Sequence, residues 1–373
     1  MERRISWSPG RRTRRCGRLA FGIVALALSS TATAAAPGLS STEVRYTVRV
    51  GYQPYFAEAW SGTLVRALRL HADRLPRGVA VEFRVGMTGG GTLAAALRHG
   101  EVDLAYLGLA PTLNVTQDLA QGDFRIIAVA SVSRRLCNVI LAQPGTSVAT
   151  REAALNWLDR RQVAVPDGTC ADFFLGSVLE RAGIHPARVI NEGFDVLATS
   201  FREHRVDAVA VWEPMATELV RTAGAVRLID GEALDEPSAT FLVASAALLR
   251  DHPDVVRGWL RAERAAQRIM ARSTDSSLPV DALGTQVADF SRETLLAVWS
   301  GQVRRGPWIP PASFPFAVTP DVAALLARTA GRMSRRGRLG SPVLRAGTVA
   351  DTTARAVLAE TESAPPATVR SGR

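Results

Sequence analysis

EFRVGMTGGGTLAAALRHGEVDLAYLGLAP, residues 82–111, predicts a strand, a glycine-rich turn, a helix and a second strand in succession. Apolar and polar residues alternate over 81–85, as they do in a half-buried strand. Three glycines and a threonine follow at 89–92, then a run rich in alanine and leucine, then an apolar strand over 102–107 closed by a turn at 108–111. A turn that leads into a helix presents backbone N–H groups and the positive end of the helix dipole. The pattern therefore predicts a βαβ unit that holds a small anion with main-chain donors.

A second copy of this design lies further along the chain. Residues 201–214, FREHRVDAVAVWEP, repeat the end of the first unit, because Val206-Asp207 corresponds to Val102-Asp103 and each pair leads into an apolar strand that ends near a proline. Before this repeat, VAVPDGTCADFF (163–174) predicts a strand, a tight turn and a helix, so that Asp167–Cys170 forms a second anion cradle. The repeat predicts two α/β lobes of similar construction. Chance similarity of two Val-Asp strands is the alternative at this point.

Composition favours a soluble protein with an arginine-rich beginning and end. At 373 residues there is room for two domains, and the 47% hydrophobic and 21% charged contents are those of a globular chain. All 45 basic residues are arginines, and the net charge is +10. Residues 1–34 hold seven arginines and one glutamate, and residues 332–373 hold eight arginines and three acids, which leaves the body near neutral. Nucleic-acid binding, which needs a basic patch on the folded body, is therefore not predicted.

The first 34 residues have the three parts of a signal peptide. An arginine-rich start is followed by the apolar run Leu19–Leu28, and Ala32-Thr33-Ala34 is a small-residue cleavage site. We expect cleavage near Ala34 and export to the periplasm, by the general secretory route or, through Arg14-Arg15, by the twin-arginine route. An uncleaved N-terminal anchor is the alternative.

Export affects how the cysteines and histidines are interpreted. Two cysteines follow the signal peptide, Cys137 and Cys170, and a lone pair in an oxidising compartment predicts a disulfide. Two buried free thiols are the alternative. The five histidines are scattered without metal-ligand spacing, so neither a metal nor another cofactor is predicted.

Five runs in a fixed order carry a resemblance to a known family. They are GYQPYF (51–56), GMTGGGTLAAALRHGEVDLAYLGLAP (86–111), VAVPDGTC (163–170), VDAVAVWEP (206–214) and DHPDVVRGWL (251–260). Together they resemble the periplasmic solute-binding proteins of ABC importers in the nitrate, sulfonate and taurine branch. The resemblance covers about residues 44–300, with a weaker trace to about 333.

The resemblance implies a two-lobed α/β periplasmic binding protein of type II, with the ligand in a cleft between the lobes. It predicts two hinge crossings, at 133–136 and 235–240. The expected domains are the signal peptide 1–34, lobe I over 35–134, lobe II over 135–236, a return of lobe I over 237–333, and a flexible arginine-rich tail over 334–373. Within this tail a helix is expected near 349–360.

In such proteins the anionic head of the ligand lies at strand C-termini, where helix N-termini enter the cleft. Backbone N–H groups and threonine hydroxyls would hold it, Tyr52, Tyr55 or Trp212 would cover its organic part, and Glu213 would pair with an amine. The matching positions are Gln53, Pro54, Tyr55, Thr88, Gly89, Gly90, Gly91, Thr92, Gly108, Leu109, Ala110, Asp167, Gly168, Thr169, Cys170, Trp212 and Glu213. Three structural roles compete with these: a tight turn at 89–91, a core or hinge aromatic at Trp212 and a hinge brace at Glu213.

The function implied is binding and not turnover. A monomer captures a small anionic solute by lobe closure and passes it to the permease subunits of an ABC importer. The alternatives are a periplasmic sensor module on the same fold, or an enzyme like the pyrimidine-precursor synthases that share it. Those synthases carry pyridoxal phosphate on a lysine, and this chain has no lysine.

Overall fold

The computed structural model describes residues 44–85, 89–272, 277–301 and 312–362. All of them belong to one compact unit, residues 42–373. The expected signal peptide and the candidate ligand residue Thr88 lie outside the described residues. Across the described ranges, no helix has both the length and the apolar character needed to cross a bilayer.

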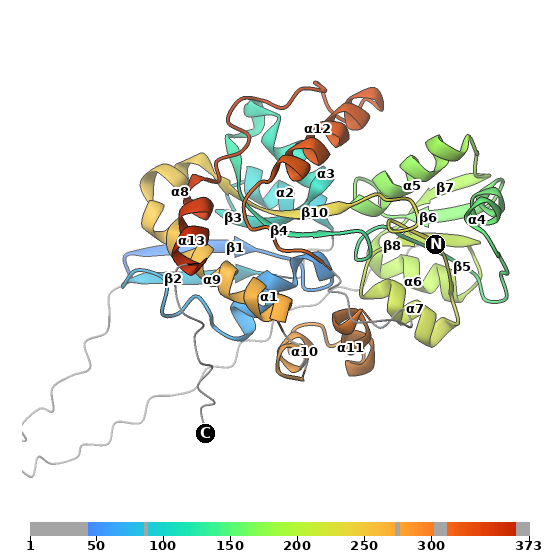
Figure 1. Cartoon of the computed structure of the whole chain (residues 1–373), viewed down its shortest axis with the longest axis horizontal. Helices are drawn as coiled ribbons and strands as arrows, with labels where there is room; N and C mark the ends of the chain where they lie inside the picture. Colours follow the sequence, from blue (N-terminus) through green and yellow to red (C-terminus); the bar gives the residue numbers. More distant parts are fainter. Residues whose placement is uncertain (1–43, 86–88, 273–276, 302–311, 363–373) are drawn as a thin grey trace, which may run out of the picture. The chain divides into compact units, whose positions relative to one another are not determined.

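The first of two sheets contains five strands (Figure 1). They are β1 (Tyr46–Gly51), β2 (Val79–Arg84), β3 (Leu104–Gly108), β4 (Phe124–Ser133) and β10 (Ser238–Ser245), in the order β2-β1-β3-β10-β4. β1 is parallel to β2 and β3, whereas β10 lies antiparallel between β3 and β4. The helices among these strands are η1 (Ala57–Ala59), α1 (Trp60–Ala67), α2 (Gly90–Arg98), α3 (Leu109–Thr116) and η2 (Leu119–Gln121). β3 is buried at every residue, which places the centre of this core at the strand that follows the glycine-rich turn and its helix.

The second sheet is also five-stranded and has a related topology. Its strands are β5 (Val139–Ala142), β6 (Gln162–Val165), β7 (Arg188–Asn191), β8 (Ala208–Val211) and β9 (Val226–Asp230), in the order β7-β6-β8-β5-β9. β6 is parallel to β7 and β8, and β5 is antiparallel to β8 and β9. Its helices are α4 (Arg151–Leu158), α5 (Cys170–Ala182), α6 (Phe194–Arg202) and α7 (Met215–Ala223).

The repeated aspartates have the same structural role in both sheets. The Asp103 carboxylate accepts a hydrogen bond from the backbone N–H of Arg49 at 2.8 Å, and Asp207 accepts one from the backbone N–H of Gln162 at 2.8 Å. In return, the N–H groups of the two aspartates donate to the carbonyls of Arg49 and Gln162. Each Val-Asp pair therefore joins the segment before a central strand to its parallel neighbour, which explains the repeat without a ligand.

The chain passes between the two sheets twice. β4 of the first sheet ends at Ser133 and β5 of the second begins at Val139, and β9 of the second ends at Asp230 before β10 of the first begins at Ser238. The predicted fold class, two α/β lobes joined by two crossings, is confirmed.

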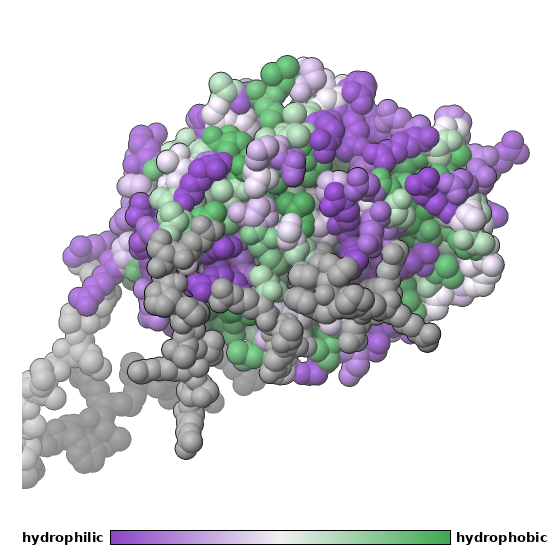
Figure 2. Space-filling view, viewed as in Figure 1, coloured by the Kyte–Doolittle hydropathy of each residue, from purple (hydrophilic) through white to green (hydrophobic). Residues whose placement is uncertain are grey.

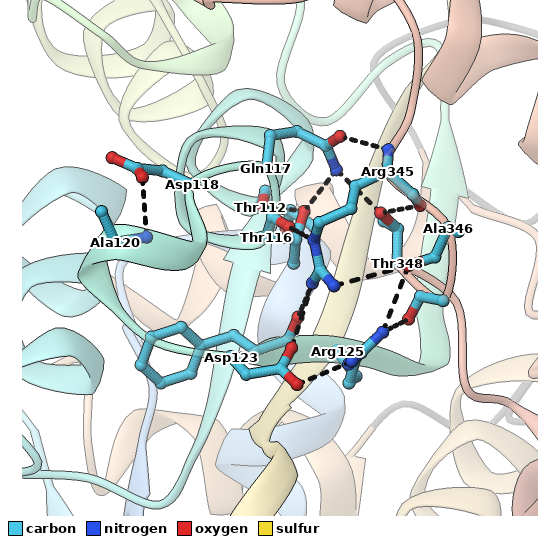
Figure 3. Close-up of polar contacts among 12 residues, drawn as sticks. Thr112, Thr116, Gln117, Asp118, Ala120, Asp123, Arg125, Arg345, Ala346 and Thr348 are labelled. Carbon is cyan, nitrogen blue, oxygen red and sulfur yellow. Dashed lines mark hydrogen bonds and ion pairs between the residues drawn. The ribbon is translucent and has the colours of Figure 1, made fainter.

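Helices make up most of the chain after β10. They are α8 (Ala246–Asp251), α9 (Pro253–Arg272), α10 (Ser277–Gly284), α11 (Arg292–Ser300), α12 (Pro320–Arg335) and α13 (Thr352–Glu362). The described part of the expected flexible tail is folded, and the helix expected near 349–360 is present as α13. α13 packs on α9, with Ala354 and Val357 completely buried, and the segment before it is held by polar contacts to residues 116–125 (Figure 3). The order of the segment before α13 comes from long-range arginine contacts, which the local sequence does not indicate.

Candidate functional site

Residues from both sheets line one small cavity. Its walls are Gln53, Phe56, Gly90, Gly108, Pro111, Thr169, Cys170 and Trp212. Gly108 is the last residue of β3, and the other four of the first five come from the loops and helices that follow β1, β2 and β3. Thr169 and Cys170 lie at the start of α5, and Trp212 follows β8. The cavity measures ≈ 20 Å³, enough for about one water molecule.

Six of the residues proposed from sequence are among these walls: Gln53, Gly90, Gly108, Thr169, Cys170 and Trp212. Phe56 and Pro111 complete the lining, although only their neighbours were proposed. Pro111 was expected in a turn, but it lies in the first turn of α3, where a missing N–H is tolerated. Leu109 and Ala110 border a second cavity of ≈ 20 Å³ on the other side of Cys170.

The glycine turn before α2 is built by packing as well as by conformation. Gly89 has φ 105°, a region that other residues rarely adopt, and its N–H donates to the buried Gln53 side chain at 3.2 Å. A Cβ at Gly90 would lie 2.4 Å from Cγ of Pro111, so only glycine fits there. Gly91 has nothing within 4 Å of an added Cβ, and Gly91 and Thr92 are both exposed. The turn thus brings the start of α2 against α3 at the wall of the cavity.

The turn before α5 already uses several of its own donors. The N–H of Asp172 donates to Thr169 Oγ1 at 3.4 Å, and that of Gly168 donates to the Asp172 carboxylate at 3.1 Å. The N–H of Asp167 donates to Asn191 Oδ1 at 3.0 Å. Burial raises the pKa of Asp172. This wall carries two carboxylates, Asp172 and Asp167, and Asp167 pairs with Arg338 at 2.6 Å. Residues 89–92 on the opposite wall have no charged side chain.

The first half of the molecule is the part built on the sheet β2-β1-β3-β10-β4, and the second half is the part built on the sheet β7-β6-β8-β5-β9. Aromatic residues connect these two halves beside the cavity. The Trp212 ring stacks on Phe194 with centroids 4.9 Å apart and meets Phe56 edge-on at 6.2 Å. Its Nε1 donates to the Tyr55 carbonyl at 2.8 Å. The Tyr55 hydroxyl donates to Asp289 at 2.7 Å, and burial together with this bond raises its pKa to about 12. Trp212 therefore both lines the cavity and joins the halves.

Two proposed ligand contacts point elsewhere. Tyr52 is completely buried and is not part of the cavity wall, and its hydroxyl donates to Gln286 and accepts from Arg66. The Glu213 carboxylate pairs with Arg227 and accepts the N–H of Thr217 at 2.9 Å. Because the partners of its carboxylate are supplied by its own half, Glu213 braces the start of α7.

Cys137 and Cys170 form a disulfide with their Cα atoms 6.3 Å apart. Cys137 is buried just before β5, at the first crossing, and Cys170 is the first residue of α5 and lines the cavity. The bond therefore fixes the start of α5 to the crossing segment. Across the described ranges, no group of three His, Cys, Asp or Glu side chains is arranged to hold a metal ion.

Sequence reasoning missed two buried acids in the first half. Burial raises the pKa of Glu58 to about 8, despite hydrogen bonds at 3.1 Å from Ser238 and Thr240 of β10. Burial likewise raises the pKa of Glu263 to about 7, despite a 2.7 Å hydrogen bond from Tyr106. Neither acid lines the cavity, so we interpret both as structural. No local pattern marks them, because their burial comes from distant elements.

Glu58 gives a pH prediction. The folded protein keeps a proton on Glu58 up to a pKa of about 8, whereas the unfolded chain loses it near 4.5, so this residue lowers stability as pH rises through that window. Glu58→Gln should raise the free energy of unfolding at about pH 8 by about 1.4 kcal/mol for each unit by which burial raises the pKa of Glu58, and it should give no gain near pH 4. Urea melts at both pH values measure this, with the exposed Glu152→Gln as control. An equal effect of Glu58→Gln at both pH values would contradict the assignment.

Comparisons with solved structures agree with the fold described above. The alkanesulfonate-binding protein SsuA from Xanthomonas axonopodis pv. citri, bound to MOPS, has a TM-score of 0.68 at 21% identity, covering 82% of this chain and 98% of that one. The periplasmic nitrate-binding protein NrtA from Synechocystis PCC 6803 has a TM-score of 0.61 at 16% identity, covering 84% and 85%. A DSZB mutant in complex with biphenyl-2-sulfinic acid has a TM-score of 0.61 at 15% identity, covering 85% and 100%.

These structures establish the shared fold. A comparison with curated protein sequences found no match. The family model described as NMT1/THI5 like matches residues 77–275, which is more than half of the chain and includes most of the residues around the cavity. The chain belongs to the NMT1/THI5-like family.

Proposed function

We propose that this protein is the extracytoplasmic solute-binding subunit of an ABC importer and that it captures a small anion of the sulfonate, taurine or nitrate class. The observation that carries the proposal is the convergence of both halves on one cavity: Gln53, Gly90 and Gly108 face Thr169, Cys170 and Trp212. Export, a monomeric state and delivery to membrane permease subunits are parts of the same proposal. No catalytic step is assigned to the site.

The size of the cavity supports capture by closure. The small volume of this space fits a closed form, and a sulfonate would enter an open form in which the halves have separated at the two crossings. The solute would bind to one half of an open form, and closure of the other half over it would create the form that docks on the permease.

The two walls suggest how an anion would be oriented. The first amides of α2 have no acceptors within their own helix, and the helix contains no acidic residue, so this end favours negative charge. At the start of α5, Asp167 is paired with Arg338 at 2.6 Å, and the carboxylate of Asp172 lies beside this pair. We therefore place the anionic head at Gly90 and the organic part against Phe56 and Trp212. The relatives named above bind a sulfonate, nitrate and a sulfinate, which agree with a site for oxyanions.

A matched glycine pair tests the placement. Gly90→Ala puts a methyl group against Pro111 and should displace the start of α2, whereas Gly91→Ala meets nothing within 4 Å. In a thermal-shift screen with taurine, ethanesulfonate, nitrate and bicarbonate, a ligand at a hundredfold over its Kd stabilises by about 2.7 kcal/mol. We expect a shift for the wild type and Gly91→Ala and a much smaller one for Gly90→Ala. Equal shifts in a folded Gly90→Ala variant would refute the placement.

A further inference from the structure

Helix α12 belongs structurally to the first half of the molecule. Its apolar residues Val322, Leu326 and Met333 are buried in one cluster with residues of α2, α3 and β10. Figure 2 shows hydrophilic residues gathered over α12 and toward α5. The other side of α12 carries charged side chains, and those near its C-terminal end form ion pairs with the second half.

Arg332 of α12 reaches a buried acid of the second half. Its guanidinium donates to Ser177 of α5 at 2.9 Å and pairs with Glu236, whose side chain is 6% exposed. The Glu236 carboxylate also accepts from Ser177 at 2.7 Å and pairs with Arg181 at 2.9 Å. Glu236 lies two residues before the start of β10, so this contact joins α12, α5 and the second crossing.

Two more arginines continue the contact along α5 toward its first turn. Arg336 pairs with Glu180 at 3.3 Å, and it lies over Gly176, where a Cβ would be 2.2 Å from Nη1 of Arg336. Arg338 donates to both carboxylate oxygens of Asp167, at 2.6 and 3.2 Å. The glycine in α5 thus makes room for an arginine that comes from a distant part of the chain.

The segment that follows is anchored back on the first half. Arg345 pairs with Asp123 at 3.1 Å and donates to the Thr116 carbonyl at 3.1 Å, and Thr348 accepts from Gln117 at 2.9 Å (Figure 3). The segment 336–345 is therefore fixed at both ends: Arg336 contacts α5, and Arg345 contacts the C-terminal end of α3.

The contact ends at the solute site. Asp167 opens the turn whose next residues, Thr169 and Cys170, line the cavity. Without a counter-ion, the carboxylates of Asp167 and Asp172 would repel an anion that approaches the start of α5. Arg338 supplies that counter-ion from outside the range matched by the family model.

We propose that Arg332, Arg336 and Arg338, here called the arginine clasp, are positioning residues of the solute site. They hold the first turn of α5 against the first half, neutralise Asp167 and so determine how long a bound anion stays. This inference rests on the proposed function, but the contact it invokes is also measurable without a solute.

The solute-free test is hydrogen exchange over residues 166–176. Arg336→Ala/Arg338→Ala should accelerate exchange in this segment and leave α4 unchanged. Arg335→Ala is the matched control, because Arg335 is the last residue of α12 and adjoins Arg336, is exposed and forms no ion pair with any described residue. Arg332 is left intact so that the buried Glu236 keeps its partner. Unchanged exchange in the double variant, or equal acceleration in Arg335→Ala, would overturn the clasp.

The second test uses whichever anion of the panel above binds the wild type, and it measures the rate at which this anion dissociates from the protein. Exposed ion pairs support an effect of up to about fivefold per pair, so the double variant should release the anion several-fold faster, with a weaker dependence on salt concentration. The charge-swapped variant Asp167→Arg/Arg338→Asp keeps an ion pair at this position, so its amide hydrogens over residues 166–176 should exchange slowly, as in the wild type. A purely steric role of Arg338 would not predict this result. If the wild type binds no anion, the proposed function fails and the exchange data alone judge the clasp. If it binds and the double variant dissociates at the wild-type rate, the clasp fails.

Discussion

Replacement of Trp212 by alanine is expected to abolish solute binding and to lower the free energy of unfolding by about 3–5 kcal/mol. Trp212 is 4% exposed, stacks on Phe194 and donates to the Tyr55 carbonyl at 2.8 Å. Its loss leaves a void between the end of β8 and the loop after β1, beside the cavity. Urea denaturation measures the stability, and titration calorimetry with the anion panel measures the binding.

A second buried tryptophan separates these two effects. Trp259 of α9 is 1% exposed, donates to the Tyr106 hydroxyl at 3.2 Å and is not part of the cavity wall. Trp259→Ala should lower stability by a similar amount while the folded protein keeps its affinity. If a folded Trp212→Ala variant bound the anion as tightly as Trp259→Ala, the cavity would not be the solute site.

Removal of the Cys137–Cys170 disulfide has the second large expected effect. The bond closes a loop with a sequence separation of 33, for which the chain-entropy model gives about 3–4 kcal/mol of stabilisation. Because Cys170 begins α5 and lines the cavity, the loss should also weaken solute binding.

The measurement compares the wild type with Cys137→Ala/Cys170→Ala by denaturation, with and without a reducing agent. The wild type should lose stability on reduction, and the variant should be insensitive to it. A wild-type unfolding curve that is the same in both conditions would show that the bond does not contribute to stability in solution.

The fold could be predicted largely because its signals are local. Alternating apolar residues marked the strands, and α5 shows why a helix boundary can be found from sequence: Thr169 caps its start through the N–H of Asp172, and Gly183 ends it with φ 63°. The Val-Asp repeat marked corresponding strands in both halves, and the structure shows that its aspartates brace those strands.

The site could be predicted only in part, because side-chain direction depends on distant partners. Tyr52 and Glu213 occupy expected backbone positions, yet Gln286 and Arg227 draw their polar groups away from the cavity. The folded segment after α12 was missed for the same reason, since nothing near Arg338 in the sequence indicates Asp167 as its partner.

Titration calorimetry of the purified protein, freed of co-purified ligand, with taurine, ethanesulfonate, nitrate and bicarbonate tests the central claim most directly. We predict saturable binding of one chemical class, retained in Gly91→Ala and lost in Gly90→Ala and Trp212→Ala. No heat from any of these anions, or binding that survives in both folded cavity variants, would contradict a small-anion site between the two halves.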